Sequence, residues 1–138
     1  MSLTQGTPAA DLLAIAARVP DLGLYGFTTQ GMRFHPQDAL SEADADTFLR
    51  VCAWLQGMTS LGHRNRRTTR YGLKHPAEDA IESYVPNGVF IAAALHCGFT
   101  ITRIPGSPNC YCNISQRDLQ HAYNATEQRN ASRRAQSV

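Results

Sequence analysis

Residues 86–114 read PNGVFIAAALHCGFTITRIPGSPNCYCNI, and they hold the clearest helix and hairpin signals in the chain. Asn87 is predicted to cap a helix over residues 88–97, with Gly98 just past its end and Phe99 as the apolar partner. Residues 99–104 and 110–114 alternate partly between apolar and polar side chains, and the loop between them is dense in turn residues. They predict an antiparallel hairpin whose core-facing side chains are Phe99, Ile101, Cys110, Cys112 and Ile114.

Helices are also predicted on both sides of this segment. Thr7 and Pro8 favour a helix over residues 8–18, and Ser41, followed by three acidic residues, favours one over residues 41–58. Residues 21–38 predict a loop that packs down in part, with a short strand. Ser115 is predicted to open a last helix, which packs through Leu119, Ala122 and Tyr123 and frays from about Arg129.

The helix around Pro76 has two possible starts. Pro76 fits best in a first turn, with Glu78 and Asp79 as the acidic residues that the helix dipole favours there and Tyr84 on the buried face. A start near Thr69 is the alternative, and it would require a kink at Pro76.

These elements predict an α+β fold that is mostly helical. From residue 41 onward the order is helix, helix, helix, hairpin, helix, which is the layout of a winged helix-turn-helix with its two-stranded wing. We expect one globular domain over residues 1–128, made of a helix and packed loop (1–40) and a helical core with the hairpin (41–128). Residues 129–138 are expected to form a flexible basic tail.

The bulk properties narrow the class of protein. The chain has 138 residues, 43% of them hydrophobic and 17% charged, which is typical of a globular domain. No apolar run approaches the roughly 20 residues that span a bilayer, and no secretory signal begins the chain. We therefore expect a cytoplasmic protein with reduced cysteines and no membrane partner. The oligomeric state is open.

Charge is divided unevenly along the sequence. Residues 1–60 carry a net charge of −3 and residues 61–138 a net charge of +5, and arginine supplies almost all of the positive charge. Such segregation indicates an anionic partner for the second half, although a preference for arginine codons would also produce it. The candidate phosphate-binding residues are Arg64, Arg66, Arg67, Arg70, Lys74 and Arg103 on the wing.

The helix over residues 88–97 occupies the recognition-helix position, yet it is apolar on all sides. Such a helix is usually buried, whereas base reading in the major groove needs polar side chains on an exposed face. Only Asn87 and His96 could serve. Nucleic-acid binding would therefore use the phosphate backbone, with little choice of sequence.

Two other groups of side chains have residue types that can bind metals or catalyse reactions. Cys97, Cys110 and Cys112 with His96 could form a zinc site, but the spacing is unusual and small buried cysteines are common core residues. His75, Glu78, Asp79 and Glu82 could share a helix face, but no nucleophile motif, phosphate loop or HExxH motif accompanies them. We expect no enzyme activity, no metal and no cofactor.

Part of the chain resembles known sequences. Tyr71-Gly-Leu-Lys-His75, Glu78, residues 84–94, Gly98-Phe99 and Pro108-Asn109 are similar to small uncharacterised proteins of bacterial plasmids and integrative elements. The resemblance covers roughly residues 64–115 and implies cargo of a mobile element. Small DNA-binding regulators and inhibitors of host systems both occur in that setting. We therefore predict an accessory nucleic-acid-binding protein; the alternative is a protein-binding or inhibitory module.

Overall fold

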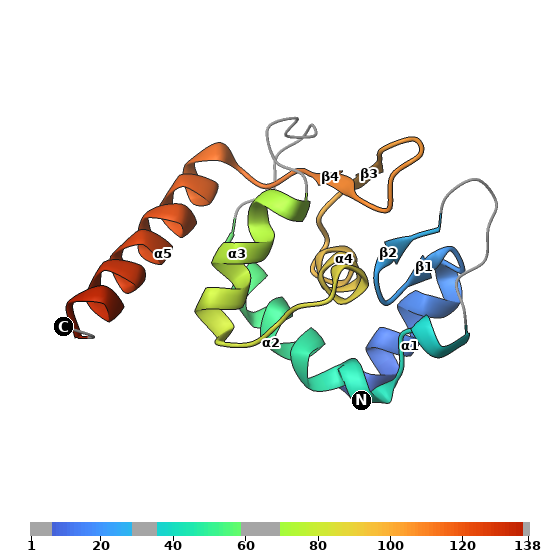
Figure 1. Ribbon diagram of the computed structural model, residues 1–138. Helices are drawn as coiled ribbons and strands as arrows, with labels where there is room; N and C mark the ends of the chain where they lie inside the picture. The colour runs from blue at the N-terminus through green and yellow to red at the C-terminus, as the bar shows by residue number, and fades with distance from the viewer. Residues whose placement is uncertain (1–6, 29–35, 59–69, 137–138) are drawn as a thin grey trace, which may run out of the picture.

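The computed structural model describes residues 7–28, 36–58 and 70–136, which are mainly helical with two short antiparallel hairpins (Figure 1). The predicted α+β class is confirmed. In chain order the elements are α1 (Pro8–Arg18), β1 (Leu22–Gly23), β2 (Gly26–Phe27), the 3₁₀ turns η1 (Pro36–Asp38) and η2 (Glu42–Asp44), α2 (Ala45–Leu55), α3 (Arg70–Ile81), α4 (Asn87–His96), β3 (Ile101–Arg103), β4 (Cys110–Cys112) and α5 (Gln116–Gln136).

Helix α1 has the predicted bounds. The Thr7 hydroxyl accepts a hydrogen bond from the amide of Ala10 at 3.1 Å, and Pro8 stands at the first helical position. Leu12 and Ile15 are buried, whereas Leu13 is exposed.

Helix α2 begins after a capping box, in which the amide of Ser41 donates to Asp44 Oδ2 at 3.0 Å. Its inward face carries Phe48 and Val51, with Cys52 and Leu55 one turn further on. Leu49, next to Phe48, is 50% exposed. The helix ends at Leu55, three residues before the predicted end.

Helix α3 begins at Arg70 and contains Pro76 in its interior, so the predicted start at Pro76 is wrong and the earlier start is right. A proline inside a helix costs about 3 kcal/mol, because it removes one hydrogen bond and its ring crowds the preceding turn. Pro76 and Ala77 are both buried, and their packing offsets this cost. Glu78 and Asp79 consequently lie toward the end of the helix, where the helix dipole does not favour acidic residues.

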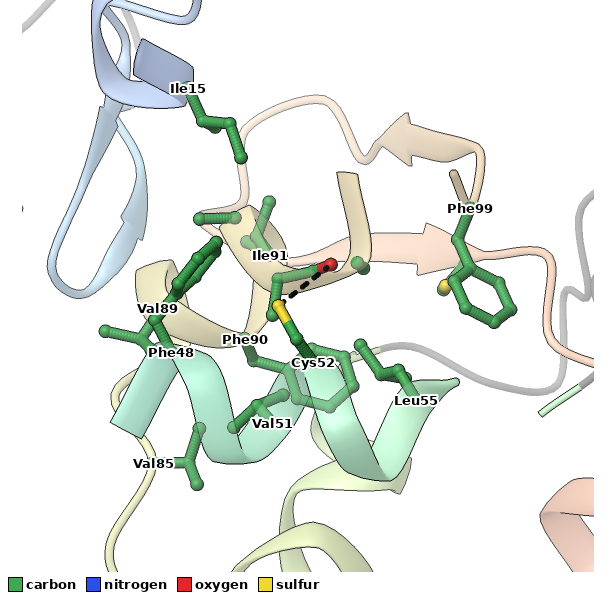
Figure 2. Packing of buried hydrophobic residues seen from close by; sticks show 14 of the residues in the cluster. Ile15, Phe48, Val51, Cys52, Leu55, Val85, Val89, Phe90, Ile91 and Phe99 are labelled. Atoms are coloured by element: carbon green, nitrogen blue, oxygen red, sulfur yellow. Dashed lines mark hydrogen bonds between the residues drawn. The ribbon is translucent and has the colours of Figure 1, made fainter. Parts of the chain in front are cut away.

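Helix α4 is the centre of the core, and α1, α2 and α3 pack around it (Figure 1). Figure 2 shows Phe90 of α4 between Val51 and Leu55 of α2, with Ile91 on another face of α4. All residues from Asn87 to Ala94 are buried, which confirms the predicted central position, although Leu95 is only partly buried. The N-cap is Pro86 rather than the predicted Asn87, which is the first helical residue.

The C-terminus of α4 is a Schellman motif. Gly98 has a φ of 88°, and the amides of Gly98 and Phe99 donate to the carbonyls of Leu95 and Ala94. Phe99 is buried, as predicted. This motif turns the chain from the central helix into the hairpin that follows.

The hairpin β3–β4 is antiparallel, with Ile101 opposite Cys112 and Arg103 opposite Cys110. Cys110, Cys112 and Ile114 are buried as predicted, while Ile101 is only partly buried. The order of helix pair, hairpin and helix is therefore present. The winged helix-turn-helix assignment itself stays a prediction, because α4 is a buried helix in place of an exposed recognition helix.

The first hairpin, β1–β2, is hydrogen-bonded to the N-terminus of α4. The amide of Gly88 donates to the carbonyl of Leu24 at 2.7 Å, and the side-chain amide of Asn87 donates to the carbonyl of Tyr25 at 3.0 Å. A Cβ atom on Gly88 would stand 1.7 Å from the carbonyl oxygen of Gly23. Only glycine at position 88 permits this approach.

Helix α5 continues through Gln136, so the predicted fraying from Arg129 is wrong for residues 129–136. The amide of Asp118 donates to the Ser115 hydroxyl at 3.1 Å and caps its start as predicted. The helix packs against α3 and makes no comparable contact with any other described element (Figure 1). None of the described helices is long and apolar enough to cross a membrane.

Candidate nucleic-acid interface

The six predicted phosphate-binding residues fall into three groups. Arg64, Arg66 and Arg67 lie in residues 59–69, outside the described part of the chain. Arg70 and Lys74 lie in the first two turns of α3. They are four residues apart, so their backbone positions share one face of that helix. Arg103 is at the end of β3.

Arg103 is engaged by its own protein. Its Nη1 donates to Asp21 Oδ2 at 3.2 Å, and its Nη2 donates to the carbonyl oxygen of Thr28 at 2.9 Å. The guanidinium carbon also lies 4.4 Å from the centre of the Phe27 ring, a cation–π contact. Arg103 thus joins β3 to the β1–β2 hairpin, and a phosphate at this position would compete with Asp21.

The recognition-helix position offers no set of exposed polar side chains. Asn87, one of the two candidate base readers, is buried and uses its side-chain amide to hold Tyr25 and Asn109. His96 is exposed, but its Nε2 lies 3.8 Å from Asp11 Oδ2 and its ring packs beside Phe48. Helix α4 is therefore a structural element of the core.

The cysteine side chains are also part of the core. The Cys97 thiol donates to the carbonyl oxygen of Cys52 at 3.6 Å, and Cys110 and Cys112 are buried. Burial raises the pKa of Cys112 to about 12 and raises that of Cys52 as well, so both thiols are neutral at physiological pH. Within the described residues, no three histidine, cysteine or acidic side chains converge in a way that could hold a metal ion.

The acidic residues of α3 have structural partners that sequence reasoning missed. Glu78 Oε2 accepts a hydrogen bond from the amide of Val85 at 2.8 Å. Asp79 accepts hydrogen bonds from Arg129 Nε and, at 2.7 Å, from Arg133 Nη1, both on α5. The Arg129 hydrogen bond holds the pKa of Asp79 below its ordinary value. The spacing of Arg129 and Arg133, four residues apart, is the sequence signal that could have indicated a shared anionic partner.

Two separate open grooves lie beside this α3–α5 contact. One groove, of about 520 Å³, is lined by Glu78, Asp79, Ser83, Tyr84, Thr126 and Asn130. Tyr84, which was predicted to be buried, is 59% exposed there. The second groove is lined by Glu82, Ala125, Gln128, Arg129, Ser132 and Arg133.

No protein-family model, curated protein or solved structure matches the chain.

Proposed function

We propose that the protein binds nucleic acid through the phosphate backbone, with little reading of base sequence. The observation that supports this most is the start of α3 at Arg70, because the basic run from Arg64 then continues directly into a helix. The backbone positions of Arg70 and Lys74 share one face of that helix, and the two residues add to the basic row of the sequence. Each phosphate that such a row neutralises adds to affinity and to salt sensitivity.

The burial of α4 supports the second half of the proposal. Base reading requires polar side chains in a groove of the duplex, and the helix in the recognition position presents none apart from His96 at its end. Because Arg103 is already paired with Asp21, we propose that the phosphate-binding surface does not centre on the β3–β4 hairpin. We therefore place the main contacts on Arg64, Arg66, Arg67, Arg70 and Lys74, with Arg103 in a minor role.

The resemblance to proteins of plasmids and integrative elements supports a bacterial mobile element as the setting, and cytoplasmic nucleic acid as the partner. Catalysis is not part of the proposal. On this view the protein is an accessory factor that coats or marks nucleic acid.

Fluorescence anisotropy with a labelled duplex, over a series of salt concentrations, tests the proposal. We expect a dissociation constant of roughly 1–100 μM near physiological salt, the range of non-specific binding, and tighter binding at low salt. Arg66→Ala/Arg67→Ala should weaken binding equally on all sequences and flatten the logarithmic salt slope by about 0.9 for each arginine that contacts a phosphate.

The matched control is Arg18→Ala/Arg50→Ala, which removes the same charge from the acidic half of the chain. It should leave the salt slope unchanged. Absence of binding to duplex and single-stranded nucleic acid at low salt would contradict the proposal, and so would equal effects of the two double variants.

A protein-binding or inhibitory module is the second candidate, and exposed aromatic side chains favour it. Tyr84 stands open in one of the α3–α5 grooves, and Tyr25 is exposed at the turn of the first hairpin. Exposed tyrosines are common in protein interfaces. A protein of this kind would ignore nucleic acid and retain one defined partner, and Tyr84→Ser would abolish that retention.

A further inference from the structure

Arg129 and Arg133 converge on a single carboxylate. The side chain of Asp79 is only 9% exposed, whereas those of Arg129 and Arg133 are 39% and 55% exposed. Two guanidinium groups share this one carboxylate, and Glu82 lines the groove beside them. The two arginines thus bind an anion that the protein itself supplies.

The site lies where α5 is attached. Among the described elements, helix α5 packs mainly against α3, and it extends away from the core (Figure 1). Its half-buried positions include Ala122, Ala125, Thr126 and Asn130. The ion pairs of Arg129 and Arg133 with Asp79 join α5 to α3 through side chains of opposite charge.

We propose that Arg129 and Arg133 form a second phosphate-binding site, which Asp79 occupies in the unbound protein and which a nucleic-acid phosphate takes over on binding. This proposal rests on the nucleic-acid-binding function proposed above. Asp79 then acts as an internal competitor that lowers affinity until a phosphate displaces it.

The chemistry of the site favours such an exchange. Arginine matches phosphate oxygens with paired N–H donors, and two arginines on consecutive turns can bind two oxygens at once. The open groove beside Arg129 and Arg133 gives a ligand access without any movement of the core. Glu82 also lines that groove, whereas Glu78 is bound to the amide of Val85 on the other side.

The first experiment compares Asp79→Asn with Asp46→Asn in the duplex-binding assay. Both substitutions remove one carboxylate that pairs with arginine, since Asp46 pairs with Arg50 on α2 at 3.1 Å. Removing one charge near a phosphate at 4 Å in water changes affinity by roughly fivefold. Asp79→Asn should therefore bind about five times more tightly, with a steeper salt slope, and Asp46→Asn should stay within about twofold of wild type because Debye screening weakens distant charges.

Adding Arg129→Ala/Arg133→Ala to Asp79→Asn should remove the gain. If Asp79→Asn binds no more tightly than Asp46→Asn, or if the gain survives loss of the two arginines, the proposed site is wrong while the nucleic-acid-binding function still stands.

A second measurement tests the anion site at Arg129 and Arg133 separately from the proposed function. It applies if no variant binds nucleic acid, which is the result that contradicts the proposed function. Inorganic pyrophosphate is titrated into ¹⁵N-labelled protein, and the Nε–H resonance of Arg129 is followed because that group donates to Asp79. The resonance should shift, and it should do so at about fivefold lower pyrophosphate in Asp79→Asn. No shift in either protein overturns the anion site itself.

Discussion

Glu82 ends α3 with a φ of 56°, and within the described ranges no other non-glycine residue has a positive φ. The amide of Ser83 donates to the carbonyl of Glu78 at 3.2 Å, the long-range hydrogen bond of a Schellman ending. Glycine is the usual residue at this position, because a Cβ atom makes the left-handed conformation unfavourable by about 1–2 kcal/mol. The chain thus keeps a strained residue at the turn that separates α3 from α4.

Glu82→Gly should stabilise the protein. The relief of strain exceeds the extra entropy that glycine gains in the unfolded chain, so the net gain should be about 0.5–1 kcal/mol. Urea unfolding followed by circular dichroism measures it. Glu82→Ala, which keeps the strain, serves as the control and should show no such gain; an equal gain in both variants would mean that the glutamate charge is responsible.

At the scale of elements, α4 depends on close packing with α2 (Figure 2). Ile91, on another face of α4, is fully buried in the core. Ile91→Ala should lower the free energy of unfolding by about 2–5 kcal/mol, since it removes apolar contacts and leaves a cavity. Leu13→Ala, at an exposed position of α1, should change it by no more than about 0.5 kcal/mol. Thermal unfolding of the two variants measures the difference, and similar melting would contradict the central position of α4.

The attachment of α5 should depend on acid. The pKa of Asp79 lies below its ordinary value in the folded protein, mainly because of the Arg129 hydrogen bond. The stabilisation by this carboxylate is therefore complete well above the ordinary carboxyl pKa, and it is lost as the pH falls through the lowered pKa. In wild type, amide exchange in α5 should become faster as the pH falls through this acidic range. In Asp79→Asn, which lacks the carboxyl, exchange should already be fast at neutral pH and should not show this rise. An unchanged acid profile in the variant would show that other carboxylates control the attachment.

The sequence predicted those elements whose ends are marked by local chemistry. Thr7 with Pro8, Gly98 with Phe99, and the turn between β3 and β4 each leave a local signature, and the structure confirms all three. The start of α3 and the extent of α5 were predicted wrongly, because tertiary contacts decide them. Pro76 is tolerated by burial, and residues 129–136 are helical beside Asp79, some 50 residues away.

The candidate site also divides into residues that the sequence indicates and contacts that only the structure shows. A basic run is visible in composition, so Arg64, Arg66, Arg67, Arg70 and Lys74 could be selected from the sequence. The engagement of Arg103 by Asp21 joins residues 82 apart, and no periodicity indicates it. Long-range ion pairs of this kind have no local signal.

For the molecule as a whole, the charge division of the sequence does not follow the described helices. Helices α1 and α2 each carry one acidic and one basic residue, α3 carries two of each, and α5 has a net charge of +2. Helices α3 and α5 lie on the opposite side of α4 from α1 and β1–β2 (Figure 1). Arg103 links the two halves of the chain, since it lies on β3 and pairs with Asp21 beside β1.

Arg103→Ala should weaken this link. The side chain combines an exposed ion pair, a hydrogen bond to a carbonyl and a cation–π contact, so its loss should cost about 1–2 kcal/mol. Arg50→Ala, which removes an exposed pair within α2, should cost no more than about 0.5 kcal/mol. Denaturant unfolding compares the two variants, and equal costs would mean that Arg103 does not connect the halves.

The hydrogen bonds between the β1–β2 hairpin and the N-terminus of α4 also bear on the deamidation of Asn87. In an Asn-Gly sequence the glycine nitrogen readily attacks the asparagine side chain, releases ammonia and forms a succinimide that hydrolyses to aspartate or isoaspartate. The Gly88 amide is held on the Leu24 carbonyl, so this deamidation requires the hairpin to lift away from the helix. A carboxylate at position 87 would then face the carbonyl oxygen of Tyr25 without a proton to donate. Deamidation of Asn87 while the hairpin is detached would thus weaken the contact that brings the hairpin back to α4.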